Sequence, residues 1–530
     1  MKANPVSVCR RCSYDANPAN ATHCIICGLS LKSGFVAPGN LFARLRSAPL
    51  GNWILPVFLL LLVATAGYIV GRNQATQPLN RRESRELISE QKVKPSPSQS
   101  RAKSTSSVAI SNSLLKRMSL GDKILVTADT TLDKQTGVQA FASGDFATAI
   151  AKLNSSLQLS RNDPEALIYL NNALAASRRA IKIAVSVPIG DNLDVAKEIL
   201  RGVAQAQNEV NQSGGINGSW LQVKIANDNN DPAIARQLAA EFVKDSSILA
   251  VVGHNTSDAS FAAAPIYQQG RLVMISPTSY ATELSGIGSY IFRTVPSSRS
   301  MAAKLAHYAL RTARIKNVAI CADNHALVSR SFKEDFTASF LAQGGIVRTN
   351  CDFSAPNFNP KTIISRAVSD GAYGLLLSPT AGNINPAIDL VRANKARLIL
   401  FGNQSLYTFK TVQLGHAGSN GMVLAVAWHP TAIPDNPFPA RAAGLWGGSV
   451  NWRTAMAYDA TGVIITAVRQ SNTRTGLQKV LRSPGFSVKG ATGRIEFLPS
   501  GDRNGAANLI RIEPGSTSGT GYDFVPVSLP

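Results

Sequence analysis

Short apolar runs alternate with stretches of helical spacing from residue 181 to about residue 515. The first run, IKIAVSVPIG (181–190), is apolar almost throughout, which is typical of a parallel strand covered on both faces. Asn192–Asn211 has the periodicity of a long helix and ends before a glycine pair. Further strands are predicted at Leu221–Ala226, Ile248–Val252, Leu272–Ile275, Asn317–Cys321, Gly345–Asn350, Gly374–Ser378 and Arg397–Phe401. Two runs of β-α units, joined near Phe292–Pro296, predict an α/β fold of two doubly wound lobes with a ligand cleft between them.

Two of these strands end in turns rich in hydroxyl groups. Ile248–Val252 runs into GHNTS (253–257), and Leu272–Ile275 runs into SPTSY (276–280), with a predicted helix at Asp258–Gln269 between them. In an open α/β sheet, ligands bind at the carboxyl ends of the strands. The stretch therefore predicts a binding crevice for a small molecule.

An uncharged apolar run, WILPVFLLLLVATAGYIV, begins at Trp53 and predicts a transmembrane helix at residues 53–71. A buried core helix would show a polar face. A cleaved signal peptide would need a much shorter segment before the apolar run. We therefore predict a retained single span. Arginines flank both ends, so charge alone does not decide its orientation.

Four of the six cysteines, Cys9, Cys12, Cys24 and Cys27, form two C-x-x-C pairs within residues 1–35. Each pair can direct two sulfurs at one tetrahedral Zn²⁺, and four sulfurs complete a structural site. The segment resembles the short zinc ribbons at the N-termini of many bacterial membrane proteins. Because thiolates persist in a reducing compartment, we expect a cytosolic N-terminus and an extracytoplasmic large domain at the bacterial inner membrane.

The region between the span and the first lobe divides into two parts. Residues 72–129 are rich in Ser, Gln, Lys, Arg and Pro and predict a flexible linker. Residues 130–179 return to helical spacing, and GVQAFASGDFATAIAKLNSSLQLSRNDPEALIYLNNAL resembles one tetratricopeptide repeat and part of a second. Repeat arrays generally need three or more repeats. This segment should therefore dock on the next domain or on a partner, or serve as a plain helical spacer. Residues 516–530 are predicted to be a tail.

The chain is basic, with 54 Lys and Arg against 32 Asp and Glu, a net charge of +22. Such an excess can indicate nucleic-acid or anionic-membrane binding. No basic run interleaved with aromatic residues is present, however, and a nucleic-acid footprint would need one. We therefore expect no nucleic-acid partner.

An ordered series of sequences carries a resemblance to a known family. It consists of GGINGSWLQVKIANDNNDPAIARQLAAEFV (214–243), VVGHNTSDASFAAAPIYQQGRLVMISPTS (251–279), YIFRTVPS (290–297), AYDA (457–460) and GATGRIEFLPSGDR (490–503). Together they resemble the type I periplasmic solute-binding proteins, in the Leu/Ile/Val-binding branch of amino-acid ABC importers. The resemblance covers about residues 180–515.

The resemblance implies a set of ligand contacts. Family members hold the α-carboxylate of the ligand in the turn that matches Thr256 and Ser257. The turn at Thr278, Ser279 and Tyr280 resembles the segment that contacts both the carboxylate and the ammonium. Hydroxyls and main-chain amides near a helix N-terminus do stabilise an anion.

The second lobe departs from the family pattern. The position that usually presents an acidic side chain to the ammonium is Gln404, which is neutral and loses a charge-assisted bond. The aromatic residues expected in the loop after Asp323 and near Thr380 are missing. A neutral amide, a carboxylate without an amine, or an acid-rich ligand therefore compete with an ordinary amino acid. Asp323 can meet a cation or cap its own turn, and the position favours the cap.

Other reactive residues are scattered. His254, His325 and His429 belong to no nucleophile elbow or H-E-x-x-H motif, so we expect structural histidines and no enzyme. Cys321 and Cys351 end successive strands and could pair only if their Cα atoms came within about 7 Å. We expect them to be unpaired.

Two functions remain open on this basis. The first is a membrane-anchored extracytoplasmic protein that clamps a small polar ligand (an amino acid, amide or small carboxylate) for an ABC permease. The alternative is a sensor or scaffold that uses the same fold and engages a cytosolic partner through the zinc ribbon.

Overall fold

The computed structural model describes residues 113–527. Within this range two α/β units, here called lobe 1 and lobe 2, are built around a six-stranded and a seven-stranded sheet. No helix in residues 113–527 is long and apolar enough to cross a bilayer. The predicted zinc ligands, the predicted span at 53–71 and residues 72–112 of the predicted linker lie outside the described residues.

Lobe 1 is organised on a sheet with the order β1-β3-β2-β4-β5-β6, parallel except for β1. The strands are β1 (Met118–Ser119), β2 (Ala180–Val187), β3 (Trp220–Asn227), β4 (Ile248–Val252), β5 (Val273–Ser276) and β6 (Ile291–Arg293). Between them run α6 (Leu193–Gln212), α7 (Pro232–Lys244) and α8 (Ser257–Gln269). Each helix begins where a polar side chain, Asn192, Asp231 or Thr256, accepts from a backbone N–H of the first turn.

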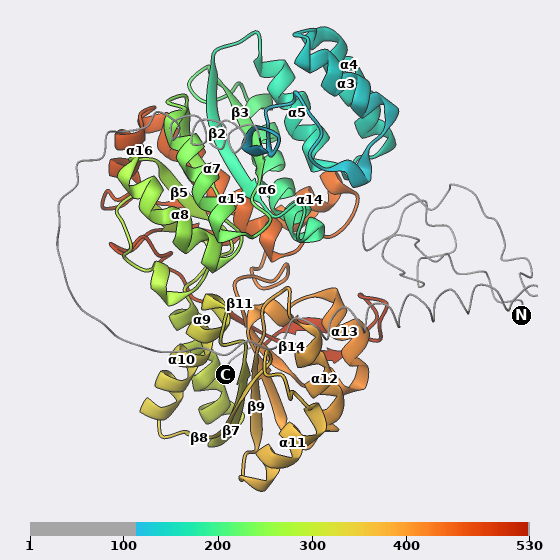
Figure 1. Ribbon diagram of the computed structural model, residues 1–530, viewed down its shortest axis with the longest axis vertical. Helices are drawn as coiled ribbons and strands as arrows, with labels where there is room; N and C mark the ends of the chain where they lie inside the picture. The colour runs from blue at the N-terminus through green and yellow to red at the C-terminus, as the bar shows by residue number, and fades with distance from the viewer. Residues whose placement is uncertain (1–112, 528–530) are drawn as a thin grey trace, which may run out of the picture. The chain divides into compact units, whose positions relative to one another are not determined.

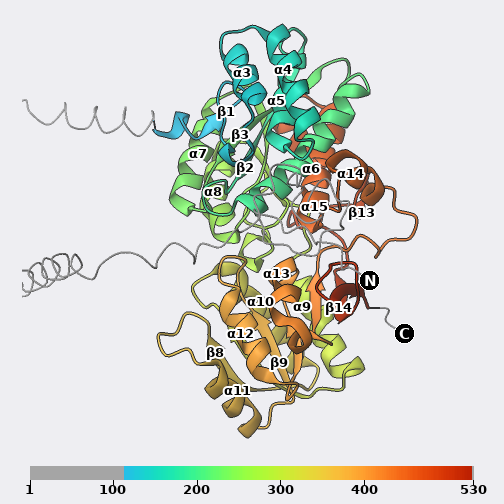
Figure 2. The same ribbon diagram turned by 90° about the vertical axis from the view of Figure 1, so that its right-hand side faces the viewer.

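The C-terminal part of the chain returns to lobe 1 and completes it. It contributes α14 (Phe438–Trp446), α15 (Trp452–Gln470), α16 (Arg474–Leu481) and the hairpin of β12 (Val488–Gly490) and β13 (Gly493–Ile495). Helix α15 packs along α6 (Figure 2). The two helices approach closely at Gly202, where an added Cβ would lie 2.2 Å from the carbonyl oxygen of Thr454. Only glycine permits this contact.

Lobe 2 is built on the order β15-β14-β11-β10-β9-β7-β8. Its strands are β7 (Asn317–Ala322), β8 (Ile346–Asp352), β9 (Gly374–Ser378), β10 (Ile399–Gly402), β11 (Val423–Val426), β14 (Asn508–Pro514) and β15 (Tyr522–Pro526). Its helices are α9 (Ser298–His307), α10 (Leu327–Ala342), α11 (Pro360–Ser369), α12 (Asn385–Asn394) and α13 (Phe409–Gly415) (Figure 1). Strands β7 to β11 are parallel to one another. Strand β14 pairs with β11 in antiparallel orientation, and β15 pairs with β14 in the same way.

The parallel strands of the two lobes share one winding order. Lobe 1 has β3-β2-β4-β5-β6 and lobe 2 has β8-β7-β9-β10-β11, each a doubly wound arrangement. The predicted two-lobed α/β fold is confirmed, and the first crossing between lobes lies between β6 and α9, near Phe292–Pro296 as expected. Two further crossings follow, from β11 to α14 and from β13 to β14. Three segments therefore connect the lobes.

The last part of the expected linker is structured. Strand β1 pairs with the edge strand β3, and Val126 is fully buried. Residues 113–129 therefore belong to lobe 1 and not to a flexible linker. The expected tail also needs correction, because β15 pairs along β14 at the edge of the lobe 2 sheet.

The predicted helical segment forms α3 (Leu132–Ala142), α4 (Phe146–Leu159) and α5 (Pro164–Ala175). Helix α5 packs against α6 and β3, so the segment docks on lobe 1 (Figure 1). A buried ion cluster strengthens this arrangement, since Lys134 Nζ lies 2.7 Å from Asp163 and 2.8 Å from Glu165. Glu165 also accepts from the backbone N–H of Leu125 at 2.7 Å. The likeness to a tetratricopeptide repeat stays a prediction.

Cys321 and Cys351 form a disulfide, contrary to the expectation of unpaired thiols. They are direct register partners on the adjacent parallel strands β7 and β8, with Cα atoms 4.6 Å apart. The sequence does not show that β7 and β8 are neighbours in this register. That pairing brings the two thiols together.

Candidate functional site

The hydroxyl-rich turns of lobe 1 lie side by side at the carboxyl ends of β4 and β5. Thr256 caps α8 by accepting from the N–H of Ala259 at 3.3 Å. Ser257 Oγ accepts from the N–H of Ala281 at 3.2 Å, and Thr278 Oγ1 donates to the carbonyl of Asn255 at 2.8 Å. These bonds tie one turn to the other.

Serine side chains complete this connection around the carbonyl of His254. Ser276 Oγ donates to that carbonyl at 2.8 Å, and Ser279 Oγ lies 2.8 Å from Ser260 Oγ. Ser257, Thr278 and Ser279 are all buried. The structure thus brings the predicted lobe 1 residues together, but their hydroxyls are engaged in hydrogen bonds within and between the two turns.

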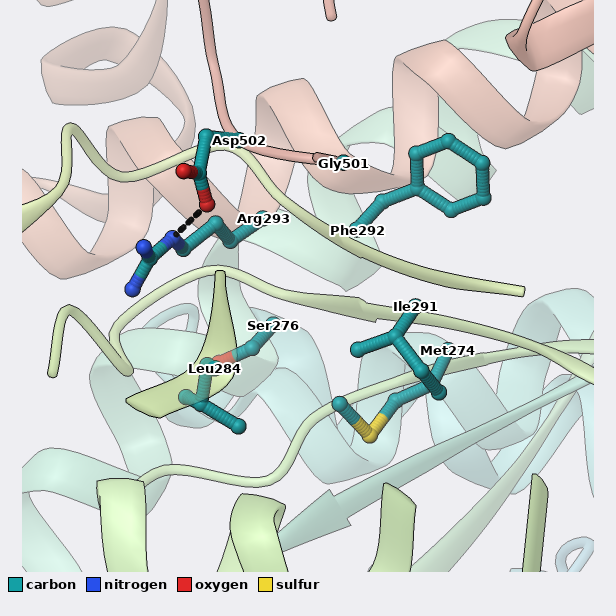
Figure 3. A pocket seen from close by; sticks show the side chains of 8 residues that line it. All are labelled: Met274, Ser276, Leu284, Ile291, Phe292, Arg293, Gly501 and Asp502. Carbon is teal, nitrogen blue, oxygen red and sulfur yellow. Dashed lines mark hydrogen bonds and ion pairs between the residues drawn. The ribbon is translucent and has the colours of Figure 1, made fainter. Parts of the chain in front are cut away.

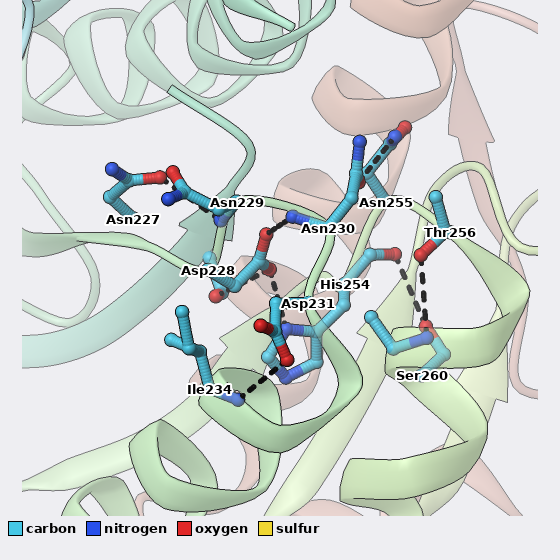
Figure 4. Close-up of polar contacts among 12 residues, drawn as sticks. Asn227, Asp228, Asn229, Asn230, Asp231, Ile234, His254, Asn255, Thr256 and Ser260 are labelled. Carbon is cyan, nitrogen blue, oxygen red and sulfur yellow. Dashed lines mark hydrogen bonds and ion pairs between the residues drawn. The ribbon is translucent and has the colours of Figure 1, made fainter. Parts of the chain in front are cut away.

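A buried acid–imidazole pair, Asp228 and His254, lies next to these turns (Figure 4). His254 Nδ1 lies 2.6 Å from Asp228 Oδ2, and His254 Nε2 lies 3.1 Å from the Tyr267 hydroxyl. Asp228 also accepts from Ser186 Oγ and from the N–H of Asn230. Burial opposes ionisation of Asp228, but its interaction with His254 and the hydrogen bonds from Asn230 and Ser186 together lower the pKa of the carboxyl. His254 therefore has partners on both nitrogens, as expected for a structural histidine.

Lobe 2 contributes a short helical turn, η4 (Gln404–Leu406), opposite Tyr280. Gln404 is fully buried, and its Oε1 accepts from the N–H of Ala427 at 3.0 Å. The neighbouring Ser405 Oγ lies 3.4 Å from the Tyr280 hydroxyl. Burial raises the pKa of Tyr280 to about 12. Tyr280 therefore meets Ser405 across the interface between the lobes, in the turn that Gln404 begins.

Asp323 is placed apart from this meeting point and caps its own turn. Its Oδ1 accepts from the N–H of His325 and from Ser354 Oγ, each at 3.1 Å, and its Oδ2 lies 3.4 Å from Asn383 Nδ2. His429 is also occupied, since its Nε2 lies 3.0 Å from the carbonyl of Phe524. Burial lowers the pKa of His429.

Arg453 was missed in the sequence. It lies in the first turn of α15, where Asn451 caps the helix by accepting from the Arg453 N–H at 2.8 Å. The residue is only 6% exposed, and burial lowers its pKa to about 10. Its charge in turn acts on Tyr280. Helical spacing places Arg453 on the same face as the buried Met456 and Ala460, and this apolar context was the signal that could have revealed it.

A second set of contacts joins the two lobes. Asp258 of α8 accepts from the N–H of Leu327 at 3.3 Å, and Glu283 lies 3.4 Å from Arg330. Thr282 Oγ1 donates to Asp335 at 2.6 Å. Burial raises the pKa of Asp258. We call these contacts, between α8 with the 282–283 turn and α10, the latch.

The cavity drawn in Figure 3 is small, about 10 Å³, which is room for a single water. It is lined by Met274, Ser276, Leu284, Ile291, Phe292, Arg293, Gly501 and Asp502. Arg293 is fully used there, donating to Asp502 at 2.7 Å and to the carbonyl of Ala281 and Ser285 Oγ at 2.6 Å. The cavity therefore lies where β6 packs against the loop that contains Gly501 and Asp502.

Residues 113–527 contain no group of three or more His, Cys, Asp or Glu that could hold a metal ion. The four predicted zinc ligands lie outside this range.

Comparison with known proteins extends over most of both lobes. Residues 180–513 match the protein family described as periplasmic binding protein. The chain is 24% identical over 315 residues to the Leu/Ile/Val-binding protein BraC3 of Rhizobium johnstonii, covering 58% of this chain and 83% of that protein.

Solved structures share the fold. An ABC transporter substrate-binding protein from Desulfitobacterium hafniense in complex with Leu superposes with a TM-score of 0.57 at 22% identity, covering 66% of this chain and 100% of that one. A solute-binding protein of an ABC transporter from Rhodopseudomonas palustris in complex with 3,4-dihydroxybenzoic acid gives 0.57 at 18% identity, covering 66% and 96%.

Proposed function

The chain belongs to the periplasmic binding protein family, and from this premise we propose that it clamps a small polar solute between its two lobes and presents it to an ABC importer. We further propose that it is an extracytoplasmic protein held at the inner membrane by the span at 53–71. The observation that carries the proposal is the meeting of Tyr280 with Ser405 across the lobes. It places the carboxyl ends of the parallel strands of lobe 1 against a polar turn of lobe 2.

The fold provides the motion that such a clamp needs. Three segments connect the lobes, and the latch contacts are polar. Two rigid sheets joined by a few connecting segments close around a ligand by hinge rotation. The crevice between them offers main-chain and hydroxyl groups, which suit a small polar molecule.

The relatives support this class of ligand and leave its identity open. One structural neighbour was solved with Leu and another with 3,4-dihydroxybenzoic acid. Both molecules carry a carboxylate, but only Leu carries an ammonium. These proteins bind solutes and are not enzymes, which supports a binding role for this chain.

Calorimetric titration of the full chain tests the proposal, using amino acids, their amides and small carboxylates. We expect one class to release measurable heat, and Tyr280→Phe to weaken its binding because the hydroxyl at the lobe interface is lost. Tyr373→Phe is the matched control, since Tyr373 is 64% exposed. Heat from none of the three classes would count against a solute-binding role.

The alternative, a sensor or scaffold, is favoured by one observation. The helical segment α3–α5 packs on lobe 1 through α5, so a partner bound to it would be coupled directly to the clamp. In this proposal Cys9, Cys12, Cys24 and Cys27 hold a structural Zn²⁺ in a cytosolic ribbon that engages a partner. Affinity capture with residues 1–35 distinguishes the two, because a cytosolic partner supports sensing, whereas recovery of an ABC permease with the full chain supports transport.

A further inference from the structure

Arg453 is a buried cation with little to neutralise it. Its Nε has no hydrogen-bond partner among the described residues, and no carboxylate in residues 113–527 lies within 4.0 Å of its guanidinium. The contact it does make is with the ring of Trp452, 4.4 Å from the guanidinium carbon. Buried charges are normally paired with an opposite charge. This one is left available.

The nearby acid is already occupied. Glu198 accepts from Thr454 Oγ1 and from the N–H of Asn451, and it pairs with Arg201. It acts on Arg453 through its charge alone. A permanent structural partner would contact the guanidinium directly, and Glu198 does not.

Arg453 lies beside the residues at which the two lobes meet. Helix α15, in whose first turn Arg453 lies, packs against β4 and β5, the strands that lead into the hydroxyl-rich turns. The Arg453 charge also favours ionisation of the Tyr280 hydroxyl, which lies 3.4 Å from Ser405. Ser405 follows Gln404 in the same turn of lobe 2. The guanidinium therefore belongs to the proposed binding interface and not to a remote part of lobe 1.

Unpartnered donors also accumulate on the lobe 2 side. Gln404 Nε2 and Trp428 Nε1 are buried without a hydrogen-bond partner among the described residues. The two residues are linked, because Gln404 Oε1 holds the N–H of Ala427, which precedes Trp428. Donors without partners call for a ligand rich in acceptors.

No carboxylate of residues 113–527 makes a hydrogen bond or an ion pair with these donors. The position that would face an ammonium is the neutral Gln404, and Asp323 is committed to its own turn. An ammonium bound here would lie near the Arg453 charge, and the nearby acid, Glu198, is already engaged with Arg201, Thr454 and Asn451. The electrostatics of the interface favour an anion.

We propose that the solute is a carboxylate without an amino group and that Arg453 binds its anionic group, in a hydrogen-bonded ion pair completed by lobe closure. The inference rests on the proposed solute-binding function. It adds a ligand class and a residue that decides between acids and amino acids.

Matched ligands test the ligand class on the full chain. We would titrate leucine, 4-methylpentanoate and 4-methylpentanamide, together with phenylalanine, 3-phenylpropanoate and 3-phenylpropanamide. Each set keeps one side chain and changes only the charged groups. We expect the acid of at least one set to bind about tenfold or more tightly than its amide and its amino acid, as a charge-assisted bond implies.

Variants test the residue. Arg453→Gln should weaken binding of the acid by about tenfold to a hundredfold and leave the amide unchanged, because only the acid loses a charged partner. Arg453→Lys, which keeps the charge, should recover part of the affinity. Arg236→Gln is the matched control, because Arg236 is exposed on α7. Circular dichroism and thermal melts establish that each variant is folded.

The outcomes separate the two proposals. If an amino acid or amide binds best and Arg453→Gln leaves its affinity intact, the ligand class is wrong and the solute-binding function stands. If none of the six compounds binds, the solute-binding proposal is contradicted together with the inference. If Arg453→Gln weakens binding of the acid and of the amide equally, Arg453 does not bind the anionic group, and its role is structural.

Discussion

At the residue scale, Arg453 places binding and stability in opposition. Its pKa is lowered to about 10 because burial disfavours the charged form, so the ionised side chain costs the folded protein stability at neutral pH. Because the folded pKa of Arg453 lies below its unfolded value, the group lowers the free energy of unfolding at every pH below the folded pKa. That range includes pH 7. A residue kept at such a cost is one that serves another purpose.

Arg453→Met should therefore stabilise the ligand-free protein. Replacing the unpaired buried charge by an apolar chain of similar length should raise the free energy of unfolding by about 1–3 kcal/mol at pH 7. Urea titration monitored by fluorescence measures the change. A loss of stability in this variant would show that Arg453 contributes more to packing than its burial costs.

For the Asp228–His254 pair we expect the opposite effect, a loss of stability when the ionisable side chain is replaced. The pKa of Asp228 is lowered from 3.8, so its ionisation stabilises the fold above that pH and the benefit is lost as pH falls through the folded pKa. Asp228→Asn should lower the free energy of unfolding by about 2–4 kcal/mol at pH 7, because it breaks a buried pair. The difference from the wild type should shrink below pH of about 4.

Urea unfolding at pH 7, 5, 4 and 3 measures this dependence. Asp389→Asn is a suitable control, because Asp389 is exposed on α12. An Asp228→Asn difference that stayed constant from pH 7 to pH 3 would mean that ionisation of Asp228 is not what stabilises the pair.

Single residues were predictable where local geometry decides their role. The Thr256 cap and the Asp323 turn follow from short-range chain geometry, which the sequence displays. The environment of Arg453 depends on Glu198 and Tyr280, which come from other elements of the fold. No local pattern shows that an arginine in an apolar helix face lacks an acidic partner.

At the element scale, the latch holds α10 of lobe 2 to α8 and the 282–283 turn of lobe 1. Thr282 makes two of its contacts, since its Oγ1 donates to Asp335 and its N–H donates to Ser331 Oγ at 2.7 Å. The hydroxyl bond exists only when the lobes are together. It should therefore contribute to the equilibrium between open and closed forms.

Thr282→Val should weaken solute binding by about three- to tenfold, because it removes a hydrogen bond to a carboxylate and keeps the side-chain shape. Small-angle scattering with saturating solute should then show a larger share of the open form. Thr282→Ser retains the hydroxyl and serves as the control. Identical affinities for the valine and serine variants would exclude the Asp335 bond from closure.

Strands with a clear hydrophobic pattern were predicted correctly, and strands without one were missed. Strands β4 and β9 match their predicted ranges, because they are continuous apolar runs buried on both faces. Strand β1 has two residues and β15 is a partly exposed edge strand, so neither has a periodicity that separates it from a loop. For this reason β1 was assigned to the flexible linker and β15 to the tail.

At the scale of the whole molecule, the disulfide has a bearing on compartment. The Cys321–Cys351 bond closes a segment with a sequence separation of 30 between β7 and β8. Such bonds persist in oxidising compartments. This agrees with the proposal that the lobes lie outside the cytosol, whereas the four N-terminal cysteines suit a reducing one.

The double variant Cys321→Ser, Cys351→Ser should lose about 3.6 kcal/mol of stability, by the loop-entropy account of a cross-link of this length. Guanidinium unfolding with and without dithiothreitol measures the loss. Reduction should lower the midpoint of lobe 2 unfolding in the wild type and leave the double variant unchanged. A wild-type midpoint insensitive to reductant would show that the bond adds nothing to stability.

Strand β1 decides which lobe is nearer along the chain to the proposed membrane anchor. Residues 113–129 belong to lobe 1, and β1 pairs with β3 of that lobe before any part of lobe 2 begins. In the anchored protein that we propose, the linker therefore leads into lobe 1, and lobe 2 is the lobe without a direct connection to the anchor. A permease would then detect the closed state by the position of lobe 2 relative to the tethered lobe 1.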